Sequence, residues 1–361
     1  MIISRTPFRI SFFGGGTDYP GWYQKHGGAV LAASIDKYCY LACRYLPPFF
    51  AHRFRVVYSK IELCQTVDEI KHPAVREVLR YLNIDRGIEI HHVGDLPARS
   101  GMGSSSAFTV GLLQAMHALK GEMTSKHQLA MEGIHVEQER IREMVGSQDQ
   151  VLAAYGGLNH VIFHQNGEIS VRPITLAPER IQLFNAHLML IYTGIERTAS
   201  TIADSYVPNI DQKRRALRTV ERLLDEALSI LSGNGDLSGI GELMHESWMA
   251  KRSLSAQVSN ARIDELYAKA RDAGAIGGKI TGAGGGGFLL LFVPPDRQDD
   301  VRAALSDHIS VPFKFEYSGS QVIFFDPEQD YSAVERVRDS QALRAFEARP
   351  LTPSERPPSG G

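Results

Sequence analysis

The chain has 361 residues, of which 43% are hydrophobic and 22% charged, and its formal net charge is −2. These proportions are ordinary for a globular protein and exclude a disordered or fibrous chain. A charge near zero excludes a nucleic-acid-binding surface spread over the whole molecule, and the length suits two domains.

The sequence pattern predicts a cytoplasmic protein without a membrane or nucleic-acid partner. Residues 1–10 lack the long apolar core of a signal peptide, and the longest apolar run, residues 288–293, is too short to span a bilayer. The cysteines Cys39, Cys43 and Cys64 include no CxxC pair. We therefore expect core thiols and no metal site on these residues.

The first half of the chain reads as short β-rich runs followed by helices. Strand patterns occupy residues 2–13, 38–45 and 87–92. One helix is predicted from Ser104 onward, and a second covers about residues 125–144 with carboxylates on a polar face.

The second half of the chain adds further strands and then long helical patterns. Strands are predicted at residues 158–164 and 188–192, helices at 211–232, 239–250 and 261–273, and strands again at 286–293 and 322–325. Strands and helices that are mixed but do not strictly alternate favour an α+β fold.

A polar, proline-containing stretch at residues 178–185 marks the predicted domain boundary. We therefore expect an N-terminal domain over residues 1–182 and a C-terminal domain over 183–345. Residues 346–361 are rich in proline and are predicted to form a disordered tail.

The segment PARSGMGSSSA at residues 97–107 has the features of an anion-binding loop. Gly101 and Gly103 can adopt positive φ, and the following serines begin an apolar-periodic helix. The N–H groups of a helix N-terminus bind anions, and a serine hydroxyl beside them can ligate Mg²⁺. The alternative is a serine-capped helix after a glycine turn.

Three glycine-rich clusters, at residues 14–18, 101–105 and 282–287, suggest one composite site. The third cluster matches GxGxxG but precedes a strand, whereas the dinucleotide fingerprint follows a strand and opens a helix. A Walker A motif is also excluded, because Ile280 follows Lys279 where the metal-binding hydroxyl is required.

Phosphoryl transfer needs a metal ligand, a group to deprotonate the acceptor and a cation for the developing charge. Glu137 could join Ser105 on Mg²⁺, and Asp149 could act as the base. Arg9 lies in an apolar strand pattern and would need a carboxylate partner such as Asp149. The alternatives are a solvated helix face for Glu137, an ordinary turn residue for Asp149 and a strand-edge arginine for Arg9.

Taken together and in order, three motifs make the chain resemble the GHMP kinases over about residues 1–340. The first motif runs from Thr6-Pro7-Phe8-Arg9 to Gly16-Thr17-Asp18-Tyr19. The second is GMGSSSA after Pro97, with Met102 where the family has leucine. The third is GGKITGAGGGG at residues 277–287.

The resemblance implies a two-domain α+β fold, with a ribosomal-protein-like N-terminal domain, a ferredoxin-like C-terminal domain and ATP between them. By the same resemblance, Ser105 and Glu137 match the metal ligands, Asp149 the catalytic carboxylate and Arg9 the arginine that pairs with it. The ATP-binding residues would be Pro97, Ser100, Gly101, Met102, Gly103, Ser104, Ser105 and Ser106.

One departure from the family narrows the expected substrate. Galactokinases have a Glu-His pair where this chain has Gly15-Gly16. The pattern is more similar to sugar kinases that act at the anomeric hydroxyl of D-glycero-D-manno-heptose 7-phosphate. The expected substrate contacts are Gly15, Gly16, Thr17, Asp18, Arg197, Gly284 and Gly285.

Such a substrate carries its own phosphate, and Arg197, Lys251 and Arg252 are the candidate cations for it. The alternatives are a fucose kinase, another sugar kinase of the family, an ATP-dependent decarboxylase of the same fold or a non-catalytic sugar sensor. The sequence leaves a monomer or a homodimer open.

Overall fold

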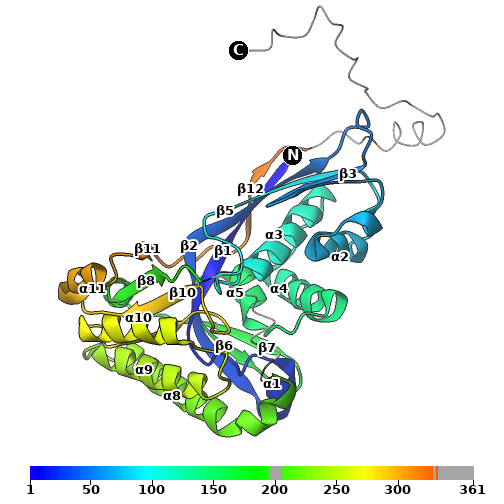
Figure 1. The fold of residues 1–361 in the computed structure, drawn as a ribbon. Coiled ribbons are helices and arrows are strands. Elements are labelled where there is room, and N and C mark those ends of the chain that lie inside the picture. Colours follow the sequence, from blue (N-terminus) through cyan, green and yellow to red (C-terminus); the bar gives the residue numbers. More distant parts are fainter. Residues whose placement is uncertain (196–202, 204, 206, 328–330, 332–361) are drawn as a thin grey trace, which may run out of the picture.

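The computed structural model describes residues 1–195, 203, 205, 207–327 and 331 (Figure 1). The predicted tail at 346–361 and Arg197 lie outside these residues. None of the described helices is both long and apolar enough to cross a membrane.

An eight-stranded sheet forms the N-terminal half, with the order β12-β1-β2-β5-β3-β4 and with β6 paired to β2 and β7. Its strands are β1 (Ile2–Phe13), β2 (Gly28–Tyr45), β3 (Phe54–Val57), β4 (Ile61–Cys64), β5 (Ile88–Gly94), β6 (Leu158–Phe163), β7 (Ile169–Pro173) and β12 (Gln321–Phe325). Strand β2 is long enough to pair with β6 through its first half and with β5 through its second half. The strand predictions at 2–13, 38–45, 87–92 and 158–164 therefore hold to within a few residues, and 38–45 is part of a longer strand.

Helices cover the inner face of this sheet (Figure 1). They are α2 (Pro73–Tyr81), α3 (Ser104–Leu119), α4 (Lys126–His135), the π-helix η2 (Val136–Ile141) and α5 (Gln148–Tyr155), with α1 (Pro20–His26) and the 3-10 turn η1 (Val67–Glu69) nearby. Helix α3 is apolar on almost every side because it packs against β1, β2, α4 and α5.

The helix predicted over 125–144 is shorter than expected. Its α-helical part ends at His135, a π-helix continues to Ile141, and Arg142 turns the chain with φ 64°. A π-helix is wider than an α-helix and changes which side chains face the core, so Glu137 is buried here while Glu139 and Arg140 stay exposed.

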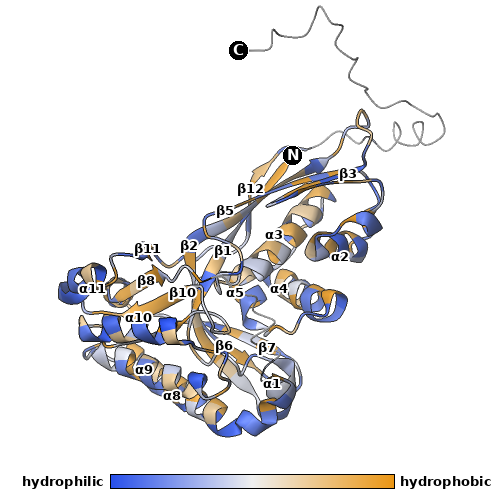
Figure 2. Cartoon of the chain, in the orientation of Figure 1, coloured by the Kyte–Doolittle hydropathy of each residue, from blue (hydrophilic) through white to orange (hydrophobic). Residues whose placement is uncertain are grey.

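A second, antiparallel sheet has the order β11-β8-β10-β9. Its strands are β8 (Leu188–Tyr192), β9 (Gly277–Ile280), β10 (Phe288–Phe292) and β11 (Ile309–Ser310). The accompanying helices are α6 (Pro178–Ala186), α8 (Arg214–Ser232), α9 (Ser238–Arg252), α10 (Ala261–Asp272) and α11 (Gln298–Ala304), with the turns η3 (Val207–Lys213) and η4 (Pro295–Arg297). Figure 2 shows β8 and β10 as hydrophobic and the outer face of α10 as hydrophilic.

The N-terminal and C-terminal halves of the chain share more structure than the predicted domain boundary at residues 178–185 implies. The stretch 178–185 belongs to helix α6, and β12 returns from the C-terminal half to pair with β1. Phe12 and Phe184 also pack against each other across the halves, with ring centroids 5.0 Å apart and the ring planes tilted by 49°. The mixed α+β class is confirmed, and the division into 1–182 and 183–345 stays a prediction.

Candidate active site

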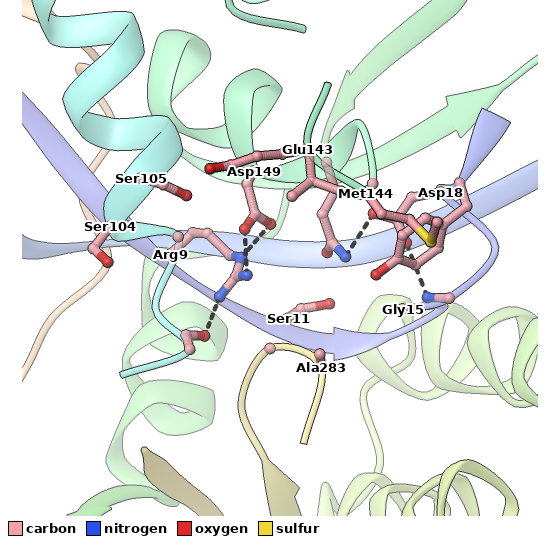
Figure 3. A pocket seen from close by; sticks show the side chains of 18 of the residues that line it. Arg9, Ser11, Gly15, Asp18, Ser104, Ser105, Glu143, Met144, Asp149 and Ala283 are labelled. Atoms are coloured by element: carbon pink, nitrogen blue, oxygen red, sulfur yellow. Dashed lines mark hydrogen bonds and ion pairs between the residues drawn. The ribbon is translucent and has the colours of Figure 1, made fainter. Parts of the chain in front are cut away.

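The three glycine clusters meet in one pocket, as the sequence predicted (Figure 3). Gly15 and Gly16 come from the first cluster, Gly101 and Gly103 from the second, and Gly282 from the third. The pocket encloses about 260 Å³ and lies where β1, the N-terminus of α3 and the loop after β9 converge. Its composite origin explains why no single motif identified it.

The N-terminus of α3 lines one side of the pocket. Gly103 caps the helix with φ 74°, and no side chain hydrogen-bonds to the cap. The serine-capped alternative is therefore wrong, and Ser104 and Ser105 line the pocket instead. A Cβ on Gly103 would lie 3.2 Å from Cγ of Arg9 and 3.4 Å from Oδ2 of Asp149, so glycine also lets this loop approach the central ion pair.

The other residues expected to bind ATP in this loop do not line the pocket. Pro97 is exposed, whereas Ser100 and Met102 are buried. The Met102 carbonyl accepts a hydrogen bond from the Arg9 N–H at 3.1 Å. A Cβ on Gly287 would lie 2.0 Å from the Ser100 carbonyl oxygen, so the second and third glycine clusters touch through their backbones.

Arg9 and Asp149 form a bidentate ion pair at the centre of the pocket (Figure 3). Nε of Arg9 donates to Oδ1 at 2.7 Å, and an Nη donates to Oδ2 at 2.6 Å. The other Nη donates to the Gly101 carbonyl at 2.6 Å. The Arg9 side chain is only 5% exposed, so the strand-edge alternative for Arg9 is wrong. Asp149 is 23% exposed, which leaves it open to a ligand.

Asp18 lies on the other side of this ion pair from Ser105 (Figure 3). It is 2% exposed, and it accepts hydrogen bonds from the Gly16 N–H and from Nε2 of Gln148, both at 2.9 Å. Burial raises the pKa of Asp18, and the charge of Asp149 adds to the rise. A Cβ on Gly146 would lie 1.9 Å from Oδ2 of Asp18, so only glycine leaves room for this carboxylate.

Thr17, expected to contact the substrate, stabilises the turn instead. Its hydroxyl donates to the carbonyl oxygens of Gly14 at 2.8 Å and Ala29 at 3.0 Å, and it does not line the pocket.

Glu137 is fully buried, so the solvated-face alternative for this residue is wrong. Its carboxylate accepts hydrogen bonds from Ser106 at 2.8 Å, from Thr109 at 2.9 Å and from Gln150. Burial raises its pKa to about 7. The expected pairing of Glu137 with Ser105 is not among these contacts, because the hydroxyl facing Glu137 belongs to the next residue, Ser106.

Of the three carboxylates that line the pocket, Glu143 and Asp149 lie on the same side as Ser105, and Asp18 lies on the other side (Figure 3). Burial raises the pKa of Glu143. Hydroxyl and carboxylate oxygens are the ligands that Mg²⁺ takes in proteins, and one or two carboxylates suffice. The oxygen atoms at this end of the pocket therefore fit a magnesium ion, with Glu137 directly behind them.

Gly284 and Gly285, expected to bind substrate, do not line the pocket. A Cβ on Gly284 would lie 2.6 Å from the Val258 carbonyl oxygen, and the Gly285 N–H donates to the same oxygen at 2.7 Å. The two glycines pack the loop against the segment before α10. From the third cluster, Gly282 and Ala283 reach the pocket.

The sequence reasoning missed Lys279 as a pocket residue. Lys279 is 2% exposed and lines the pocket with Lys251, which is 5% exposed. Lys279 is the one charged residue of the buried strand β9, and this position could have identified it in the sequence. Arg252 is not in the pocket, because its guanidinium pairs with Asp264 at 2.6 Å.

Comparison with known proteins gives the family. The N-terminal domain model of the GHMP kinases matches residues 68–157, and the C-terminal model matches residues 222–311. The chain belongs to the GHMP kinases. This GHMP kinase is a phosphotransferase with an alcohol group as acceptor, and the family uses ATP as phosphate donor.

Two curated relatives cover much of this GHMP kinase. The D-glycero-alpha-D-manno-heptose 7-phosphate kinase of Campylobacter jejuni is 26% identical over 331 residues, which are 84% of this chain and 93% of that protein. The mevalonate kinase of Pyrococcus horikoshii is 28% identical over 234 residues, which are 63% of this chain and 65% of that protein.

A solved structure agrees with the fold. The crystal structure of a D-glycero-D-manno-heptose 1-phosphate kinase from Bacteroides thetaiotaomicron superposes with a TM-score of 0.74 at 21% identity. The match covers 90% of this chain and 100% of that chain.

Proposed function

We propose that this GHMP kinase transfers the γ-phosphoryl group of ATP to the anomeric hydroxyl of D-glycero-D-manno-heptose 7-phosphate, giving the 1,7-bisphosphate for nucleotide-activated heptose synthesis. The observation that carries the proposal is the bidentate Arg9–Asp149 pair, which lies between an anion-binding helix terminus and the buried Asp18. The heptose 7-phosphate kinase relative supports the choice of sugar.

The chain's own residues divide the reaction between them. The N–H groups at the start of α3 and the Ser104 and Ser105 hydroxyls receive the ATP phosphates. Asp149 accepts the proton of the attacking hydroxyl as the phosphoryl group departs from ADP. Arg9 holds both oxygens of Asp149 in place and balances its charge. Asp18 binds a sugar hydroxyl and fixes the acceptor relative to Asp149.

A magnesium ion would neutralise the charge on the β- and γ-phosphates. Ser105 and Glu137 are the proposed ligands. Glu137 already accepts hydrogen bonds from Ser106, Thr109 and Gln150 and does not line the pocket, whereas Glu143 lines the pocket with Ser105. The two candidates can be distinguished by measuring nucleotide binding at increasing magnesium concentrations in Glu137→Gln and in Glu143→Gln. The variant that has lost the true magnesium ligand should need a higher magnesium concentration to bind the nucleotide.

The decisive experiment measures ADP release from ATP with a panel of acceptors: heptose 7-phosphate, unphosphorylated heptose, fucose, galactose and mevalonate. We expect the highest kcat/KM with heptose 7-phosphate. No signal with that sugar and a strong signal with another would overturn the substrate choice. Carbon dioxide release would instead indicate a decarboxylase, and the absence of acceptor-dependent ADP release would indicate a sugar sensor.

A further inference from the structure

Two buried lysines line the pocket, and the residues proposed above for phosphoryl transfer do not include them. Lys279 comes from β9 and Lys251 from the C-terminal end of α9, so distant segments bring the two ammonium groups together. Both are at least 95% buried, at 2% and 5% exposure. Burying an ammonium group is costly unless an anion or several acceptors compensate it.

The Lys279 ammonium has spare donors. Its Nζ donates to the Phe12 carbonyl oxygen at 3.2 Å, and no carboxylate of the described residues lies within ion-pair distance of it. An ammonium group has three N–H donors. Lys251 donates to the carbonyl oxygen of Gly282, in the loop that closes the pocket. Lys279 can therefore turn at least one further N–H toward a ligand in the pocket.

The charges around the lysines favour an anion. Burial, together with the nearby charges of Lys251 and Arg9, holds the pKa of Lys279 well below its usual range. The negative charge of Asp18 acts in the opposite direction and raises the pKa of Lys279. Burial raises the pKa of Asp18 itself. Asp149 is already neutralised by Arg9. A bound anion would offset the repulsion between the cations.

The position of the lysines points to the acceptor and not to ATP. Figure 3 shows Ser104 and Ser105 on one side of the Arg9–Asp149 pair and Gly15 and Asp18 on the other. Lys279 contacts Phe12, just before the glycine turn that leads to Asp18, and it interacts electrostatically with Asp18. Lys279 therefore lies toward the side of the ion pair opposite the N-terminus of α3, and the charge of Lys251 is close enough to act on it.

We propose that Lys279 and Lys251 form a cationic subsite for a phosphate monoester carried by the sugar acceptor. This inference rests on the proposed function, in which the acceptor is a sugar phosphate. The terminal oxygens of the phosphate accept N–H donors from both lysines, and this contact selects phosphorylated sugars over neutral ones. Arg252, bound to Asp264, takes no part.

The test compares Lys279→Met and Lys251→Met with the matched variant Lys269→Met, whose exposed lysine pairs with Glu265 on α10. For each protein we would measure kcat/KM with heptose 7-phosphate and with unphosphorylated heptose, and the Kd of ADP without sugar. We expect the preference for the phosphorylated sugar to fall by about tenfold or more in each pocket variant. The Kd of ADP and all values for Lys269→Met should match the wild type.

The proposed subsite would be contradicted if kcat/KM fell equally with both sugars in the pocket variants. It would also be contradicted if ADP binding weakened while the preference for the phosphorylated sugar stayed unchanged. Inorganic phosphate provides a second test in the wild type, independent of whether the variants fold. It should inhibit competitively against the sugar, and competition against ATP alone would also overturn the subsite. If the wild type phosphorylates a different acceptor, the proposed function fails, and phosphate competition against that acceptor still tests the two lysines.

Discussion

At the scale of single residues, close contacts between a few side chains determine the chemistry of the pocket. Arg9 is buried in β1 and uses its three nitrogen atoms on Asp149 and on the Gly101 carbonyl. The fixed guanidinium geometry allows one orientation of the Asp149 carboxylate, with both oxygens held. The same ion pair therefore lies between Ser105 at the start of α3 and Asp18, which are the proposed nucleotide and acceptor sides of the pocket.

Replacing Asp149 by Asn should lower kcat by about 10²- to 10⁴-fold, because the amide cannot accept the acceptor proton. The Kd of ADP, measured by calorimetry, should change little, since the α3 terminus is intact. Asp307→Asn, at an exposed position, is the matched control. Wild-type turnover in Asp149→Asn would remove this residue from the mechanism.

Gly146 provides a steric test of the role of Asp18. An alanine Cβ there would lie 1.9 Å from Oδ2 of Asp18, so the carboxylate must move. We expect kcat/KM for the sugar to fall by about 10²-fold while the Kd of ADP is retained. Gly235→Ala is the control, because nothing lies within 4 Å of its added Cβ. Unchanged sugar kinetics in Gly146→Ala would argue against a substrate contact by Asp18.

At the scale of elements, a buried histidine joins α3 to α4. His117 of α3 contacts Glu132 of α4 at 2.7 Å and Glu122 of the connecting loop at 2.8 Å. Burial alone would lower its pKa, but the hydrogen bonds and charges of Glu132 and Glu122 outweigh burial and raise it. Because the N-terminus of α3 lines the pocket, this contact holds the helix in place at the end far from the pocket.

The raised pKa of His117 makes part of the stability depend on pH. The folded-state pKa of His117 lies above its unfolded value of about 6.5. Its contacts with Glu132 and Glu122 therefore contribute fully to the free energy of unfolding below about pH 6.5, and this contribution is lost as pH rises through the folded-state pKa. We expect the difference in free energy of unfolding between the wild type and His117→Gln, measured by urea titration, to shrink on going from about pH 6 to about pH 9. The exposed His127→Gln should show no such trend, and a constant difference for His117→Gln would contradict the linkage.

At the scale of the whole molecule, the chain crosses between its halves more than once. After the second sheet is complete, residues 313–325 return to the first. The Gly157 N–H donates to the Glu316 carbonyl at 2.6 Å, and Thr6 and Ser320 share a buried hydrogen bond of 2.8 Å. Phe315 packs edge-on against Phe12 with centroids 6.2 Å apart. The C-terminal strand is therefore part of the N-terminal sheet.

A fragment of residues 1–182 should consequently fail to unfold cooperatively on heating, because it leaves the β1 edge and the core around Phe12 uncovered. Residues 1–345, which lack only the tail predicted at 346–361, should retain the transition temperature of the full chain. Calorimetry on both fragments is the test. A cooperative transition in 1–182 would show that the N-terminal half folds without β12.

Much of the local structure could be predicted from spacing alone. Strands β1 and β8 match the predicted ranges, and α8 to α10 begin and end within a few residues of theirs, because periodicity depends on neighbouring residues. The chief error in extent was the helix beyond His135, where the chain changes to a π-helix. Glu137 lies in this π-helix and is buried, which the charged pattern of the segment did not indicate.

By itself, the sequence determined the mixed α+β class and the three glycine motifs, and it offered Asp149 as a candidate partner for a buried Arg9. Only the tertiary structure decided which residues of each motif reach the pocket. It placed Ser106 and not Ser105 on Glu137, bound Arg252 to Asp264 and set Lys279 beside the turn of Asp18. The physical reason is that burial and electrostatics depend on partners from distant segments, and chain spacing does not specify which segments meet.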